Sequence, residues 1–122
     1  MKDKENLDDI LYEELYKDYL KLLPEKINYL NSLINDFSII QSEERLMTIV
    51  RSVHSIKGSA GSYGHDFLSK ICRGWEDKLM SFKDFEKYKD DILKISFSGL
   101  KIFREYLENQ KIEETIDHSD FF

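Results

Sequence analysis

Residues 42–64 read SEERLMTIVRSVHSIKGSAGSYG, and this stretch decides the fold that the sequence predicts. Apolar residues recur in it at spacings of three and four, which is the period of one face of an α-helix. Ser42 is suited to cap the N-terminus of this helix, two glutamates suit its first turn, and Gly64 can end it. We therefore expect a helix of about five turns. Its apolar face consists of Leu46, Ile49, Val50, Val53, Ile56, Ala60 and Tyr63.

Apolar series of the same period flank this helix on both sides. Pro24 divides the segment before it, because proline suits a first helical turn but not a helix interior. We therefore expect a short N-terminal helix followed by a new or kinked one. Two further helices follow, one capped by Asp66 and one by Asp84, and Gly99 on the apolar face of the last should admit a close neighbour. The apolar series occupy residues 7–22, 27–37, 68–82 and 85–107.

Each predicted helix is apolar along one stripe only, and the connections between the helices are short. The fold class is therefore all-α, and we expect an antiparallel up-down-up-down four-helix bundle with a short additional N-terminal helix. A chain of 122 residues with 41% hydrophobic residues suits one domain with one core. We expect that domain to span residues 1–122, with a helical core over about 7–110 and a polar tail over 111–122.

The chain carries a net charge of −6 at pH 7. Nucleic acids and anionic membranes would repel it, so neither is an expected partner. The first residues lack the apolar core of a signal peptide, no segment approaches the length of a bilayer span, and the single Cys72 excludes an intramolecular disulfide. We expect a soluble, cytoplasmic monomer, and the richness in Lys, Ile and Asn suggests a bacterial source.

His54 lies on the solvent face of the central helix. At about 100° per residue, it departs by roughly 130° from the mean direction of the apolar residues. Arg51, Lys57, Gly58 and Gly61 share this outward face at i−3, i+3, i+4 and i+7. Each glycine costs about 1 kcal/mol relative to alanine within a helix, so packing alone does not favour two of them there. They leave the imidazole accessible to the backbone of another protein.

An exposed, neutral imidazole is a good nitrogen nucleophile at about pH 7, and it can take a phosphoryl group from an acyl phosphate. The phosphoryl group adds roughly −1.5 to −2 charges, which Lys57 and Arg51 can partly neutralise from adjacent turns. The chain contains no glycine-rich phosphate-binding loop. It is therefore expected to be a phosphoryl carrier without kinase activity of its own, and not an autonomous enzyme.

Residues 54–64, HSIKGSAGSYG, resemble the signature of histidine phosphotransfer (HPt) domains. That signature is His, a small or polar residue, an aliphatic residue, Lys, Gly, Ser or Ala, Ala, an aliphatic or aromatic residue, and a closing Gly. Residues 15–33, LYKDYLKLLPEKINYLNSL, resemble the family's first long helical segment, and residues 67–79, FLSKICRGWEDKL, resemble the helix after the histidine. The resemblance extends over most of residues 7–110.

The resemblance assigns a role to several residues of this sequence. It implies that His54 accepts the phosphoryl group through Nε2, that Lys57 steadies the group, and that Gly58 leaves room for it. Glu76 falls where family members often have Gln or Glu that hydrogen-bonds the imidazole from the neighbouring helix. A carboxylate there would accept from Nδ1–H and leave Nε2 free to attack. Gly74 and Trp75 depart from the family pattern, which has helix-forming and smaller aliphatic residues at these positions.

The leading hypothesis is a phosphorelay intermediate of two-component signal transduction. His54 would accept a phosphoryl group from a phospho-aspartyl receiver domain and pass it to another receiver. The expected partners are response-regulator receiver domains and a sensor histidine kinase. No cofactor or metal is expected on this chain, because Mg²⁺ belongs to the receiver partner.

Two alternatives remain open. The domain could be phosphorylated directly by a separate chemotaxis-type histidine kinase, which Glu76 favours, or it could be a non-catalytic helical bundle that binds a receiver. His65 and His118 are interpreted as surface histidines without a role, and we do not expect His54, His65 and Cys72 to form a zinc site. Two terminal aromatic residues, Phe121 and Phe122, are interpreted as a frayed end rather than a docking motif.

Overall fold

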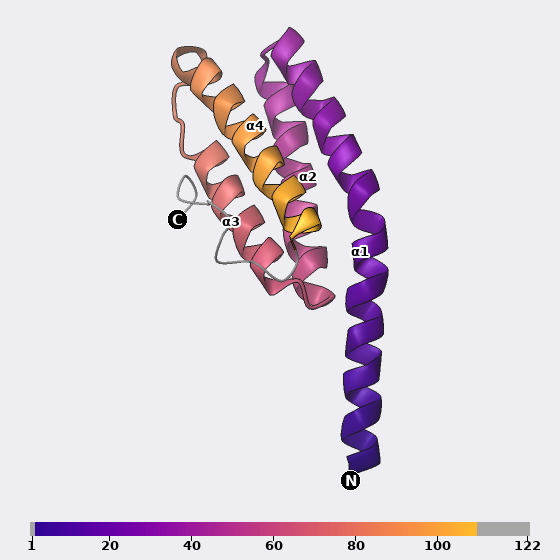
Figure 1. Ribbon diagram of the computed structural model, residues 1–122. Helices are drawn as coiled ribbons and strands as arrows, with labels where there is room; N and C mark the ends of the chain where they lie inside the picture. Colours follow the sequence, from indigo (N-terminus) through magenta and orange to yellow (C-terminus); the bar gives the residue numbers. More distant parts are fainter. Residues whose placement is uncertain (1, 110–122) are drawn as a thin grey trace.

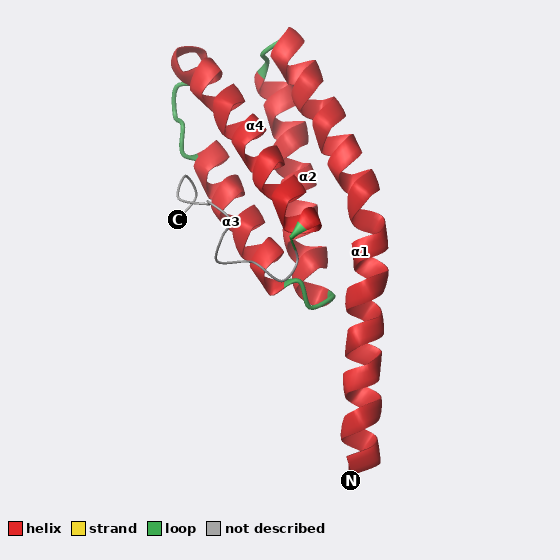
Figure 2. Cartoon of the chain, viewed as in Figure 1, coloured by secondary structure: helices red, strands yellow, loops and turns green. Residues whose placement is uncertain are grey.

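The computed structural model describes the backbone of residues 2–109 and the side chains of residues 7–109, and this range contains helices but no strand. The helices are α1 (Lys2–Ile39), α2 (Glu43–Ser62), α3 (Asp66–Met80) and α4 (Phe85–Glu108) (Figure 1). Short loops join them (Figure 2). The predicted all-α helical bundle is confirmed. The predicted polar tail, with His118 and the two terminal phenylalanines, lies outside the described residues.

The four helices pack so that α2 lies against both α1 and α3, while α4 packs against α1 and α3 on the other side of the bundle. In Figure 1 the chain runs upward through α1 and α3 and downward through α2 and α4. The flanks of α2 are therefore covered by two neighbouring helices, and its outer face is open. His54 lies on that open face.

The ends of α2 follow the predicted signals. Ser42 has an extended backbone, and its Oγ accepts a hydrogen bond from the Arg45 N–H at 3.2 Å, which satisfies one free donor of the first turn. Gly64, after the last turn, has a φ of +86°, which glycine adopts without strain. The start of α3 differs from the prediction, because His65 occupies the N-cap position and Asp66 is the first helical residue.

The first helix corrects the prediction for the N-terminal segment. No separate short helix precedes Pro24, because α1 continues through this proline from Lys2 to Ile39. Pro24 is exposed, and its missing N–H removes one intrahelical bond on the solvent side of α1. Figure 1 shows that α1 curves along its length. Tyr19 and Leu23 before the proline and Ile27 and Leu30 after it are all buried. Burial of this common stripe holds both halves of the helix against the bundle.

The N-terminal part of α1 extends beyond the end of the bundle (Figure 1). Its apolar residues Leu7, Ile10 and Leu11 are therefore exposed, although their spacing predicted a buried stripe. This segment therefore continues α1 and does not form the short additional helix that was predicted.

One continuous core joins the four helices, and Trp75 is its largest fully buried side chain. The indole fills a notch at Gly99 of α4, where a Cβ atom would overlap the Trp75 ring. The prediction that Gly99 admits a close neighbour is therefore confirmed. Gly74, which departs from the family pattern beside this tryptophan, is also buried and does not interrupt α3.

Candidate functional site

His54 lies halfway along the open face of α2, and 63% of its side chain is exposed. The prediction that the imidazole faces solvent is confirmed. Gly58, one turn later, also faces open space, because a Cβ atom there would meet nothing within 4 Å. The helix surface on the C-terminal side of His54 is thus bare, and an approaching protein meets backbone there instead of side chains.

A carboxylate from the neighbouring helix holds the imidazole. Glu76 of α3 lies with Oε1 at 2.8 Å from Nδ1 of His54. Its second oxygen, Oε2, accepts a hydrogen bond from Nζ of Lys57 at 2.8 Å. One carboxylate therefore bridges the histidine and a lysine that lies one turn away on α2. The contact that the family resemblance implied for Glu76 is present.

The bridge defines the tautomer of His54. An ionised carboxylate can only accept hydrogen bonds, so Nδ1 of His54 carries the proton that faces Glu76. In the neutral ring the lone pair then resides on Nε2, and no described residue hydrogen-bonds that atom. The structure accordingly presents Nε2 as the available nucleophile.

Glu76 is ionised at neutral pH. Only 17% of its side chain is exposed, and burial alone would raise the pKa of the carboxyl. Hydrogen bonds from Lys57 and His54, together with the positive charge of Lys57, outweigh this effect and lower the pKa below its usual range. The site thus keeps a fixed negative charge behind the imidazole.

Close packing of α2 against α3 positions Lys57 and Glu76. Ser69 of α3 donates from Oγ to the main-chain carbonyl of Lys57 at 2.8 Å. A Cβ atom on Gly61 would approach that same Oγ to 3.3 Å, so a glycine at this position lets the helices come together. Gly61, predicted to clear the surface around His54, therefore lies at the contact between α2 and α3.

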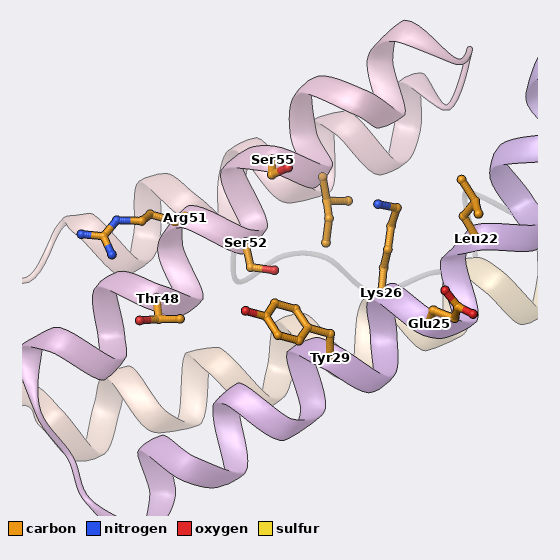
Figure 3. Close-up of a pocket in the computed structure, with 9 residues that line it drawn as sticks. Leu22, Glu25, Lys26, Tyr29, Thr48, Arg51, Ser52 and Ser55 are labelled. Carbon is orange, nitrogen blue, oxygen red and sulfur yellow. The ribbon is translucent and has the colours of Figure 1, made fainter.

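Two hollows flank His54. The first lies between α2 and α3 and is polar. Its lining contains three cationic side chains, Lys57, Lys70 and Arg73, and one acidic side chain, Asp66. The second is a groove between α1 and α2, and Arg51 lies on its rim (Figure 3). Arg51, predicted to stand beside His54, therefore lies on the α1 side of it and Lys57 on the α3 side. The two cations do not share one carboxylate, because only Lys57 reaches Glu76.

His65 corrects the interpretation of a surface histidine. Its side chain is only 1% exposed, and both ring nitrogens are hydrogen-bonded. Nδ1 lies 2.6 Å from the Tyr106 hydroxyl of α4, and Nε2 lies 2.9 Å from the Tyr16 carbonyl of α1. The ring stacks on that of Tyr16 with centroids 3.7 Å apart. Burial lowers the pKa of His65, although its bond to Tyr16 and the nearby Asp66 partly oppose this effect.

The remaining candidate groups do not extend the site. Cys72 is fully buried, and burial raises the pKa of its thiol, so the thiolate is suppressed. Within residues 7–109, no three His, Cys, Asp or Glu side chains gather as a metal site would require. None of the helices in the described part of the chain combines the length and apolar composition of a bilayer span.

Comparison with known proteins adds one match. The family model described as the Hpt domain matches residues 14–111. The matched range contains residues 14–39 of α1 and all of α2, α3 and α4. No curated protein and no solved structure matches the chain.

Proposed function

Because the chain belongs to the Hpt domain family, whose members carry a phosphoryl group on a histidine in phosphorelays, we propose that His54 is its phosphoryl acceptor. The observation that carries this assignment is the contact of 2.8 Å between Nδ1 of His54 and Glu76. It leaves Nε2 exposed and unprotonated on an open helix face. His65, by comparison, has both nitrogens bonded inside the core and has no access to a partner.

The transfer step needs little from this chain beyond that nucleophile. The Nε2 lone pair of His54 attacks the phosphorus of an aspartyl phosphate, an N–P bond forms, and the bond from phosphorus to the aspartyl oxygen breaks. The aspartate leaves as a carboxylate, and no proton has to move. The imidazole ring becomes cationic when Nε2 is phosphorylated, and the negative charge of Glu76 beside Nδ1–H stabilises it. Transfer to a second receiver is the reverse reaction.

Lys57 and Gly58 assist on the solvent side. The phosphoryl group brings roughly −1.5 to −2 charges, and Lys57, one turn from His54, can offset part of them while it remains near Glu76. The open space over Gly58 accommodates the group and the partner's backbone. The receiver is expected to supply Mg²⁺, which neutralises charge on the transferring group.

The partners in this proposal are receiver domains of response regulators, with a sensor histidine kinase upstream. The chain would act as a monomer, since a single exposed histidine suffices for each transfer. It would work in the cytoplasm. The domain would span the whole chain, with its helical core within residues 7–110.

The direct test mixes the protein with Mg²⁺ and a receiver domain carrying a radiolabelled aspartyl phosphate. Transfer should give label on this chain that is stable to base and labile to acid, as expected for phosphohistidine. The matched control is His54→Gln, with circular dichroism to show that its helices remain. Label on both proteins, or on neither, would contradict the assignment, and the second result would favour a non-catalytic receiver-binding bundle.

A second candidate function rests on the same contact. A histidine that Glu76 holds in this way can also take the γ-phosphoryl group of ATP from a separate chemotaxis-type kinase domain. Replacing the receiver by such a kinase and ATP distinguishes the two sources. Faster labelling by the kinase than by any receiver would make this domain a kinase substrate.

A further inference from the structure

The hollow between α2 and α3 extends well beyond the two residues, Lys57 and Gly58, that the transfer step described above uses. It encloses about 800 Å³. Its walls are formed mainly by small and cationic residues of both helices, among them Lys57, Gly58, Gly61, Ser69, Lys70 and Arg73. Gly58 lies one turn after His54, so a group seated in this α2–α3 hollow lies beside the proposed acceptor.

The charge of the α2–α3 hollow favours an anionic occupant. Three cations and one acid line it, so its lining is net positive in a chain of net charge −6. Lys57 already shares the carboxylate of Glu76 with His54. Arg73 has no carboxylate within 4 Å among the described side chains. A segment rich in carboxylates is therefore complementary to this hollow.

Residues 110–122, QKIEETIDHSDFF, form a segment of this chemistry in the same chain. They contain one lysine and four carboxylates, which belong to Glu113, Glu114, Asp117 and Asp120. Because the segment follows α4 directly, it would meet the bundle at an effective concentration of about millimolar, which a separate acidic protein rarely reaches.

The end of α4 lies close to the hollow. The rings of Tyr106 in α4 and Phe67 in α3 stack with centroids 6.2 Å apart, and α4 ends at Glu108. Lys70 and Arg73 follow Phe67 by about 4.5 and 9 Å along the axis of α3. A helix is about 10 Å wide and an extended chain advances about 3.3 Å per residue, so about four to six residues beyond Asn109 suffice to reach both cations.

Other charged surfaces fit this segment less well. The N-terminal part of α1 exposes Asp8, Asp9 and Glu13, which would repel it. Lys94 and Lys101 are exposed on α4, but they lie on a single helix. The α2–α3 hollow instead offers cations from two helices around one depression.

We propose that residues 110–122 bind the α2–α3 hollow of their own chain, with Glu113 and Glu114 near Lys70 and Arg73, and compete there with the phosphodonor. A segment in the hollow would cover Gly58 and approach Lys57, so a receiver would have to displace it. The contact itself is independent of the proposed function, whereas the competition rests on it. The segment would slow phosphorylation of His54 without changing the bridge from Glu76.

A spin label on the segment tests the contact in the full chain. Thr115→Cys places a nitroxide between the carboxylates, and Cys72 does not take the label because it is fully buried. The amide NMR signals of Gly58, Gly61 and Arg73 should broaden, while that of Lys101 on α4 should not. Salt at about 1 M, which screens charges beyond about 3 Å, should weaken the broadening.

Neutral variants then identify the charges that matter. The tail variant combines three changes, Glu113→Gln, Glu114→Gln and Asp117→Asn. The matched control makes the same changes at exposed carboxylates in the first half of α4, Glu86→Gln, Asp90→Asn and Asp91→Asn. The tail variant and Arg73→Gln should each lose the broadening at Gly58, and the control should keep it.

Phosphoryl transfer from a receiver domain tests the competition. The rate of labelling of His54 should rise about threefold in the tail variant and stay near the wild-type value in the control. The expected gain is modest because exposed ion pairs are individually weak.

The outcomes separate the contact, the competition and the proposed function. Broadening that is absent, evenly spread over the helices or centred on α4 would overturn the contact. Broadening of an isotope-labelled chain by a separate spin-labelled chain would overturn it too, because a second copy would then occupy the hollow. Broadening in the hollow with an unchanged transfer rate in the tail variant would overturn the competition. If wild type accepts no phosphoryl group from any receiver, the proposed function fails and the competition with it, while the broadening still decides the contact.

Discussion

Replacement of the buried histidine by phenylalanine tests how the N-terminal helix is fastened to the bundle. His65→Phe keeps an aromatic ring to stack on Tyr16 but removes the bonds to the Tyr106 hydroxyl and the Tyr16 carbonyl. Each buried hydrogen bond contributes about 0.5–1.5 kcal/mol net. We therefore expect the free energy of unfolding at neutral pH to fall by about 1–3 kcal/mol. That is a substantial part of the roughly 5–15 kcal/mol that stabilises a domain of this size.

The same residue should make stability depend on pH. Burial lowers the pKa of His65 in the folded state, whereas in the unfolded chain it titrates near its usual value of 6.5. Below that value the unfolded state binds the proton more readily, so stability is greatest above it and is lost as pH falls toward the lower folded pKa. His65→Phe should lack this part of the pH dependence, while His54→Gln, which retains the buried ring, should keep it.

Urea denaturation followed by fluorescence supplies the measurement. Trp75 is the single tryptophan and is fully buried, so its emission reports unfolding of the core. Unfolding curves at several pH values from neutral down to mildly acidic give the free energy of unfolding of each protein and its dependence on pH. The reasoning would be refuted if His65→Phe were as stable as the wild type at neutral pH. It would also be refuted if the stability of the variant fell with pH as steeply as that of the wild type below the usual histidine pKa.

Three further substitutions test the site and the core. Glu76→Gln should slow receiver-dependent phosphorylation about fivefold, because a charged acceptor contributes about 1 kcal/mol more than a neutral one, and single-turnover transfer measures it. Lys57→Ala should also slow transfer while circular dichroism stays unchanged, since it lies on the solvent-facing flank; a loss of helicity would contradict that placement. Gly99→Ala should lower the free energy of unfolding by about 1–3 kcal/mol, because the methyl group of the alanine would overlap the rigid Trp75 ring. A urea denaturation curve of this variant that matched the wild-type curve would contradict this.

The central helix could be predicted from its sequence because its determinants are local. Ser42 caps it, Gly64 ends it, and the apolar spacing assigns its buried face, so the exposure of His54 followed from helix geometry alone. The bridge from Glu76 was reached differently, through the family resemblance. Periodicity places Glu76 on α3 but does not say how α3 lies against α2.

Two predictions failed where tertiary contacts outweighed local rules. Pro24 was expected to divide the N-terminal segment, but burial of Tyr19, Leu23, Ile27 and Leu30 on one stripe keeps the helix continuous. His65 follows a helix stop and was interpreted as exposed, whereas its bonding partners lie 41 and 49 residues away in sequence. No spacing rule connects residues so distant along the chain.

The two glycines that follow His54 on α2 show how packing and chemistry depend on one another. Gly58 borders open space, so its role concerns what approaches from outside, whereas a Cβ atom on Gly61 would lie 3.3 Å from Oγ of Ser69, so a side chain there would require the serine to shift. Ser69 bonds the Lys57 carbonyl, and Glu76 lies two turns further along the same helix, in contact with both His54 and Lys57. A shift of α3 at Gly61 would therefore also move the carboxylate that fixes the imidazole tautomer. The reactivity of the exposed histidine is thus determined by how closely two helices pack beneath it.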